Sequence, residues 1–135
     1  MQFNFGVKGI IRKKDKILVL KRSGNDVHKP GIWETSGGTM DENISPQEEL
    51  KREINEETGL EVKVCEPFNV FTFIRDDTKE FKIGITFLCD YISGEVILSE
   101  EHSEYKWIKP EEFKQLESIE SLHSEIEKYA KKYGK

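Results

Sequence analysis

The chain has 135 residues, of which 36% are hydrophobic and 35% charged, and its formal net charge is −5 at pH 7. This size and composition predict a single domain spanning residues 1–135, with enough apolar side chains for one core. The acidic balance argues against general nucleic-acid binding, because phosphate backbones are bound through excess Lys and Arg. No apolar run approaches the roughly 20 residues that cross a membrane, and the first residues do not begin a signal peptide, so we expect a cytoplasmic protein.

In chain order, the first predicted elements are two strands between Phe3 and Arg22, on either side of the charged turn Lys13–Lys16. A loop is expected from Gly31 to Gly38. It ends in paired glycines, which let a backbone turn sharply or approach a ligand closely.

A helix from Pro46 to Thr58 is the clearest local prediction. Ser45 is a suitable N-cap, Pro46 favours the first helical position, and Glu48 completes a capping box. Gly59 is placed to end the helix in the left-handed region.

Beyond this helix the pattern predicts a long hairpin, further strands and two late helices. The first expected strand runs from 62 to 74, marked by apolar residues at 62–64 and 68–74, and the others are at 80–91, 96–98 and 105–108. A turn is expected at 75–78, and helices at 111–116 and from 118 onward. This order is typical of an α/β (α+β) sandwich. The cysteines, Cys65 and Cys89, lie in strand-like runs without metal-ligand spacing, so we expect buried free thiols.

The predicted central helix gathers negative charge on one face. At about 100° per residue, four carboxylates fall within roughly a 100° arc: Glu49, Glu53, Glu56 and Glu57. Two interpretations are open. Exposed acidic helix faces are common, but hard cations such as Mg²⁺ or Mn²⁺ also bind clustered carboxylates, often together with substrate phosphates.

The segment from Gly38 to Leu60 resembles the Nudix box, a Gly and a later Glu followed by Arg-Glu-hydrophobic-x-Glu-Glu-x-Gly-hydrophobic. Arg52 to Leu60 matches its second half without a gap, and Trp33-Glu34 before the glycines is similar to the MutT-like branch. The early Glu of the family is replaced by Ile44, which puts loop geometry and rate in question more than reaction type. The resemblance covers about the first two-thirds of the chain plus the Trp107 strand, and implies a Nudix-type α/β/α sandwich with a central mixed β-sheet.

The resemblance also implies a metal centre that uses Mg²⁺, with Mn²⁺ possible. Its ligands would be the Gly37 carbonyl, Glu53, Glu56 and Glu57. Glu53 would also position or deprotonate the attacking water. Arg52 would hold these carboxylates in place, the alternative being an ordinary surface ion pair.

Relatives add a distant acidic residue as ligand or base, and here Glu101, followed by Glu104, is the candidate. A solvated acidic loop is the alternative for both. His102 could contact phosphate or face solvent, and of the two we expect it to face solvent. His28 and His123 lack ligand spacing and are expected at the surface.

Candidates for substrate contact are Arg22, Trp33 and Gly38. Arg22 closes a strand and would meet phosphates, or simply be a strand-end charge, and Gly38 would also serve the turn. Trp33, like Phe71 and Phe73, could stack on a base or belong to the core. No Asn follows Asn69, so specificity for oxidised guanine nucleotides is not supported.

These residues predict a pyrophosphohydrolase acting on a small nucleotide, most simply a nucleoside triphosphate cleaved to monophosphate and pyrophosphate. ADP-ribose or a dinucleoside polyphosphate would suit the same box. A non-catalytic nucleotide sensor is a third hypothesis, suggested by Ile44 but opposed by the intact Glu53, Glu56 and Glu57. Nudix domains of this size frequently pair, so a homodimer is possible.

Overall fold

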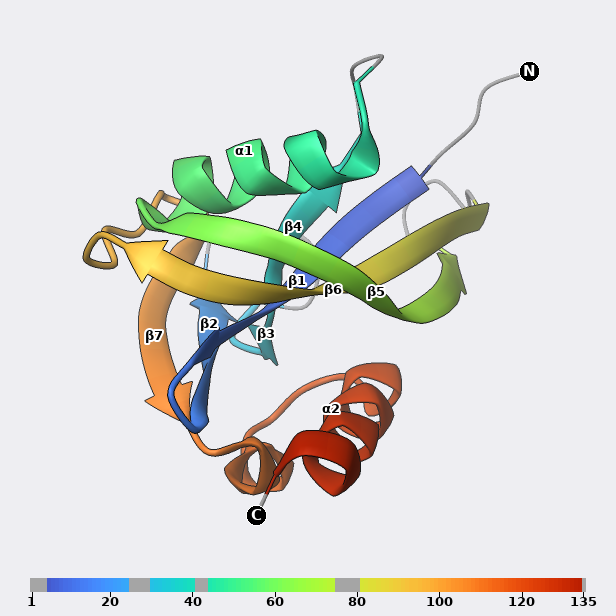
Figure 1. Cartoon of the computed structure of the whole chain (residues 1–135). Helices are drawn as coiled ribbons and strands as arrows, with labels where there is room; N and C mark the ends of the chain where they lie inside the picture. The colour runs from blue at the N-terminus through green and yellow to red at the C-terminus, as the bar shows by residue number, and fades with distance from the viewer. Residues whose placement is uncertain (1–4, 25–29, 41–43, 75–80, 135) are drawn as a thin grey trace.

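The computed structural model describes residues 5–24, 30–40, 44–74 and 81–134, apart from the side chains of Phe73 and Ile74. Figure 1 shows a sheet with one long helix on each side. In chain order, the elements are β1 (Phe5–Lys13), β2 (Lys16–Arg22), β3 (Trp33–Glu34), β4 (Ser36–Thr39), α1 (Pro46–Thr58), β5 (Glu61–Ile74), β6 (Phe81–Ser93), β7 (His102–Ile108), the 3-10 helix η1 (Pro110–Gln115) and α2 (Glu120–Tyr133).

The described strands form one seven-stranded mixed sheet. Its main order is β3-β2-β1-β6-β5, and β4 pairs with β1 while β7 pairs with β2. The two central strands, β1 and β6, run parallel, with Phe5 opposite Ile83 and Arg12 opposite Asp90. The other pairings are antiparallel.

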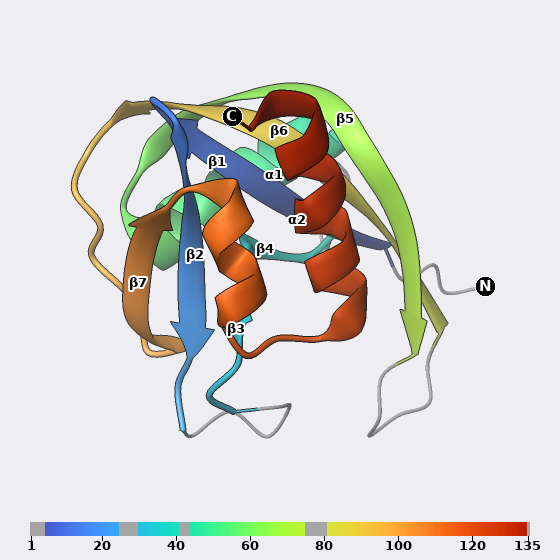
Figure 2. The same cartoon turned by 90° about the horizontal axis from the view of Figure 1, so that it is seen from below.

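Each face of the sheet carries its own hydrophobic cluster, because successive side chains of a strand point to opposite faces. Leu50 and Ile54 of α1 pack on one face against Val7 and Phe87. Ile126 and Tyr129 of α2, with Phe113 of η1, pack on the other. Figure 2 shows η1 and α2 together on the face opposite α1, as the sequence predicts for an α/β/α sandwich.

Helix α1 has the predicted bounds, and its caps explain them. Ser45 accepts a hydrogen bond through its Oγ from the backbone N–H of Glu48 at 3.2 Å, which satisfies one free donor of the first turn. At the other end Gly59 adopts φ 75°, and its N–H donates to the carbonyl of Asn55 at 2.8 Å. The left-handed backbone favours glycine at this position.

Several predicted elements need correction. The loop expected from Gly31 to Gly38 contains two short strands, β3 and β4. The strand expected at 96–98 is absent from the described structure. The N–H of Ile97 donates to the carbonyl of Thr58 at 2.9 Å, and that of Ser99 to the carbonyl of Glu57 at 3.2 Å. This segment therefore binds to the end of α1 and pairs with none of the described strands.

The remaining differences concern boundaries. The strand expected from 62 to 74 is present as β5 (Glu61–Ile74), and its register shifts around Pro67. Strand β7 begins at His102, three residues earlier than expected, and the short helix after it is η1. The turn expected at 75–78 lies outside the described residues.

Two whole-chain expectations can be compared with the structure. Cys65 and Cys89 are both free thiols; Cys89 is buried, and burial raises its pKa to about 12, whereas Cys65 is only half-buried. Within the described part of the chain, no helix combines the length and apolar composition needed to cross a membrane.

Candidate active site

The two glycines of β4 leave room for close neighbours, β1 beside Gly37 and the Glu53 carboxylate of α1 beside Gly38. A Cβ on Gly37 would lie 2.1 Å from the carbonyl oxygen of Val7, and a Cβ on Gly38 would lie 2.8 Å from Oε2 of Glu53. A larger residue at position 37 would clash with the backbone of β1, and one at position 38 would displace the Glu53 carboxylate. Gly38 therefore lets the acidic face of α1 lie directly against β4.

Glu57 joins the end of α1 to β4. Its side chain is buried, and Oε1 accepts hydrogen bonds from Ser36 Oγ at 2.8 Å and from the backbone N–H of Gly37 at 3.3 Å. Burial raises the pKa of Glu57, although nearby Lys8 and the Ser36 hydrogen bond oppose the rise. The carboxylate is thus held in place beside the glycine strand.

Glu53 lies one turn earlier and is half-buried. Burial, together with the negative charges of Glu57, Glu56 and Glu49, raises its pKa to about 7, while Arg52 opposes this rise. In the absence of a compensating cation, a large fraction of Glu53 therefore carries a proton at neutral pH.

The donor set on this face suits a divalent cation. Mg²⁺ and Mn²⁺ prefer carboxylate and carbonyl oxygens, and Glu53, Glu56, Glu57 and Gly37 offer both kinds. A cation would also offset the repulsion that raises the pKa of Glu53. In the ranges that the structure describes, no three Asp, Glu, His or Cys side chains are arranged so that they could hold a metal ion between them. These residues therefore suit a divalent cation by the type of their donor atoms and by their negative charge.

Two positive side chains and a histidine surround Glu34, close to this acidic face. Oε1 of Glu34 lies 3.0 Å from Arg22 Nη2 and 3.4 Å from Lys8 Nζ, and Oε2 lies 2.7 Å from His102 Nε2. Burial would raise the pKa of Glu34, but Lys8, His102 and Arg22 outweigh it and hold that pKa well below its usual range. Glu34 thus holds the cationic side chains of Lys8 and Arg22, together with the His102 ring, near the metal-ligand candidates.

The acidic loop was expected to supply a further ligand or base. Its two candidates, Glu101 and Glu104, have different surroundings. Glu101 is exposed, and its carboxylate lies close enough to Glu57 to contribute to the raised pKa of that residue. Glu104 instead pairs with Lys21 at 3.2 Å on the surface. His102 was expected to face solvent, but it is buried against Glu34, so that prediction is wrong.

The aromatic candidates also need correction. Trp33 is only 6% exposed and belongs to the hydrophobic cluster under α2, with Lys106 Nζ 5.2 Å from its ring centre. Its ring is therefore a core side chain rather than an open stacking surface. Phe71 is half-buried and packs over Gly84, whose added Cβ would lie 2.3 Å from the ring.

Three further residues were named from the sequence: His123, His28 and Phe73. His123 is half-buried, with its ring centre 5.0 Å from that of Phe113. His28 and the Phe73 side chain lie outside the part of the chain that the structure describes.

Sequence reasoning missed the roles of Lys8 and Glu34. Lys8 lies within an otherwise buried strand, between Val7 and Ile10, and its Nζ also lies 3.3 Å from the Thr35 carbonyl. A charge inside such an apolar run was the available signal. Glu34 gave no separate signal, because its partners come from three strands.

A mixed sheet between two helices, with an acidic helix face against a Gly-Gly strand and cations beside it, defines a Nudix-type enzyme. Residues 2–129 match the NUDIX domain family, and the chain belongs to that family. It is a Nudix pyrophosphohydrolase, as the Arg52–Leu60 motif predicts.

Similar proteins agree with this assignment. The chain is 34% identical over 127 residues to a protein of Methanocaldococcus jannaschii named ADP-ribose pyrophosphatase, covering 94% of this chain and 70% of that protein. It is 33% identical over 112 residues to an Escherichia coli protein named nucleoside triphosphatase NudI, covering 76% and 79% respectively. The crystal structure of a MutT protein from Methanosarcina mazei superposes with a TM-score of 0.84 at 29% identity, covering 98% of this chain and 96% of that one. These similarities confirm the predicted fold and its MutT-like character.

Proposed function

We propose that this chain is a Mg²⁺-dependent nucleoside triphosphate pyrophosphohydrolase. Water would cleave the anhydride between the α- and β-phosphates, and the products would be a nucleoside monophosphate and pyrophosphate. The observation that carries this proposal is the position of Glu53, whose carboxylate lies against Gly38 and is surrounded by negative charge. Such a site favours a divalent cation and an anionic substrate bound together.

The acidic face of α1 would hold the cation through Glu53, Glu56, Glu57 and the Gly37 carbonyl. When bound, the cation would neutralise phosphate oxygens and lower the pKa of an attacking water. Glu57 is already fixed by Ser36 and Gly37. Glu53 is less constrained, and we assign it to orienting the water and accepting its proton. Glu101, close to Glu57, is the second candidate for that base.

The cations beside this face would bind the substrate phosphates. Arg22 and Lys8 are partly exposed and held at fixed positions by Glu34. A fixed cation loses less conformational freedom when it binds a phosphate. Trp33 is withdrawn from the substrate set because it lies in the core, and Gly38 keeps a structural role as the surface against which Glu53 packs.

Replacing Lys8 with Met should lower kcat/KM about 10- to 100-fold, because a hydrogen bond to a charged group contributes about 1.5–3 kcal/mol. Steady-state kinetics on the preferred nucleotide would measure the loss. Lys16→Met is the matched control, since Lys16 is an exposed lysine at the opposite end of β2 from Arg22. Equal kinetics for the two variants would remove Lys8 from the phosphate site.

ADP-ribose hydrolysis is the second candidate, supported by the archaeal relative that carries that name. The same acidic face would cleave its diphosphate, giving AMP and ribose 5-phosphate. The two candidate substrates differ in the group attached to the phosphate farther from the nucleoside.

A mixed panel of nucleoside triphosphates, ADP-ribose and dinucleoside polyphosphates would test the proposal, with phosphate and pyrophosphate detected separately. We expect Mg²⁺-dependent release of pyrophosphate from a triphosphate. Preferential cleavage of ADP-ribose would favour the second candidate, and metal-independent turnover would contradict both.

A further inference from the structure

Glu49 is a carboxylate of α1 for which the family motif gives no role. It lies one turn before Glu53, and its side chain is 0% exposed. Its Oε2 contacts Arg52 Nη2 at 2.5 Å. Its Oε1 is also buried and has no hydrogen-bond partner within the described ranges. Removing a carboxylate from water costs several kcal/mol unless it is well paired, so this arrangement is unlike an ordinary surface ion pair.

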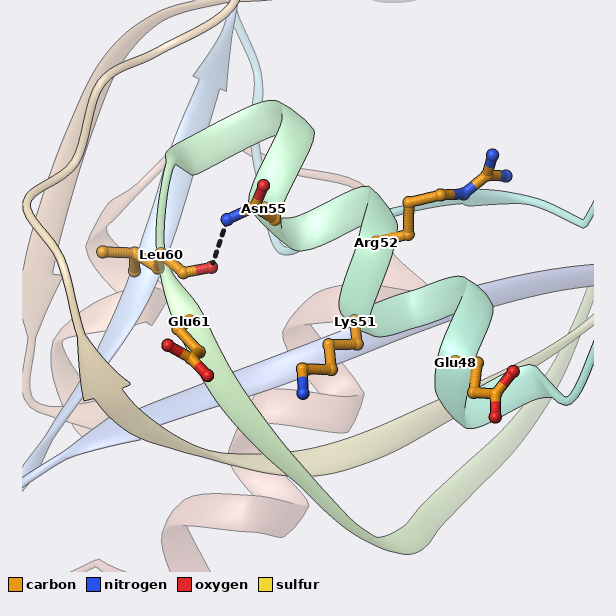
Figure 3. Close-up of a pocket in the computed structure, with 6 residues that line it drawn as sticks. All are labelled: Glu48, Lys51, Arg52, Asn55, Leu60 and Glu61. Carbon is orange, nitrogen blue, oxygen red and sulfur yellow. Dashed lines mark hydrogen bonds between the residues drawn. The ribbon is translucent and has the colours of Figure 1, made fainter.

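Arg52, the other member of the pair, is long and 42% exposed. Figure 3 shows its side chain extending from α1 at the edge of an open groove, whose other labelled residues are Glu48, Lys51, Asn55, Leu60 and Glu61. Its positive charge acts on Glu53 and opposes the rise in the pKa of that residue. An exposed arginine contributes such a charge consistently only if it is held in one position.

We propose that Glu49 is a positioning residue for the hydrolysis: it acts through Arg52, fixing the guanidinium beside Glu53. The proposal rests on the metal-dependent reaction assigned to Glu53 above. Residue 44, which precedes the N-cap of the same helix, is an isoleucine and cannot supply a carboxylate to Arg52. In this chain a buried carboxylate within α1 does so.

Two other roles for Glu49 fit the observations less well. As a further cation ligand, Glu49 could offer only Oε1, because Arg52 occupies Oε2, and its full burial conflicts with the water-rich shell that Mg²⁺ retains. As a simple i,i+3 helix pair it would contribute only a few tenths of a kcal/mol and would be exposed. Neither role explains why both oxygens are removed from solvent beside Glu53.

A double-mutant cycle tests the proposal, using Glu49→Gln, Arg52→Ala and the double variant. In the wild-type background, Glu49→Gln should reduce kcat about 10- to 100-fold, the usual range for residues that orient metal ligands, with the substrate KM within about twofold. In the Arg52→Ala background the same change should have no further effect on kcat. Glu48→Gln is the matched control, because Glu48 is the adjacent glutamate of the same helix and is exposed.

Mn²⁺ binding without substrate gives a second readout, which does not depend on the substrate being known. Glu49→Gln should weaken Mn²⁺ binding about tenfold in the wild-type background and leave it unchanged in the Arg52→Ala background. Glu49→Asp retains the charge but withdraws the carboxylate from Arg52, so it should show a loss in the same direction even if Gln disturbs the helix.

The outcomes separate the hypotheses. Losses that multiply in the double variant would show that Glu49 acts independently of Arg52, as a metal ligand would, and would overturn the proposal. Wild-type values of both kcat and Mn²⁺ affinity in folded Glu49→Gln would overturn it as well. Absence of turnover by the wild-type enzyme would contradict the proposed reaction instead, and the Mn²⁺ cycle would still decide the coupling of Glu49 to Arg52.

Discussion

Glu53→Gln is expected to reduce Mg²⁺-dependent turnover by about 10²- to 10⁴-fold, the range for loss of a general base. Gln has nearly the same shape but can neither accept the proton of water nor contribute a negative charge to the cation. The rate of pyrophosphate release at saturating substrate would measure the loss. Glu48→Gln removes an exposed glutamate from the same helix and should stay within about twofold of the wild type.

The same variant should be more stable than the wild type when metal is removed. The folded-state pKa of Glu53 is raised above its ordinary value of 4.5 to about 7, so ionisation disfavours folding. The destabilisation is absent below pH 4.5, develops between pH 4.5 and 7, and is complete above pH 7. Metal-free Glu53→Gln should therefore have a higher melting temperature at pH 8 but not at pH 4.5. A lower melting temperature than that of the wild type at pH 8 would indicate that the variant is inactive because it misfolds.

The second large effect concerns Mg²⁺ binding, which is expected to weaken about tenfold per pH unit below pH 7. The cation requires ionised Glu53, whose pKa in the metal-free protein is raised to about 7. Below this pH a proton has to leave before the cation binds, and above it the competition disappears. Near pH 6, binding should therefore release about one proton, and at pH 8.5 almost none.

Calorimetry in two buffers with different enthalpies of ionisation would count the released protons. Mn²⁺ can replace Mg²⁺ if the heat of Mg²⁺ binding is small. The Glu53→Gln variant should lose most of its Mg²⁺ affinity, and the affinity that remains should no longer depend on pH. An affinity that is constant between pH 5.5 and 8.5 would show that Glu53 is not a ligand.

Helix α1 could be predicted to the residue because the information is local. Ser45, Pro46 and Gly59 each satisfy or remove backbone groups at the helix ends, and Leu50 and Ile54 define its buried side. The position of the acidic face follows from the same spacing. What the spacing cannot give is the distance from this face to the sheet, which depends on Gly37 and Gly38 pairing with β1.

The cationic half of the site could not be predicted from local pattern. Lys8, Arg22 and His102 lie on β1, β2 and β7, and they meet only because these strands pair around Glu34. His102 looks like a loop residue in sequence, yet strand pairing buries it. Trp33 follows a loop and precedes the glycines, and only its strand neighbours show that it faces the core.

Folding of this chain should be slow compared with that of a helical domain of similar size. Its central parallel strands, β1 and β6, join residues such as Arg12 and Asp90, which are 78 positions apart, and such long-range pairing delays folding. Strand β1 also carries Lys8 and the backbone against which Gly37 packs. During synthesis on the ribosome, β1 would therefore lack its parallel neighbour until β6 had emerged, and α1 would lack the complete sheet on which Leu50 and Ile54 pack.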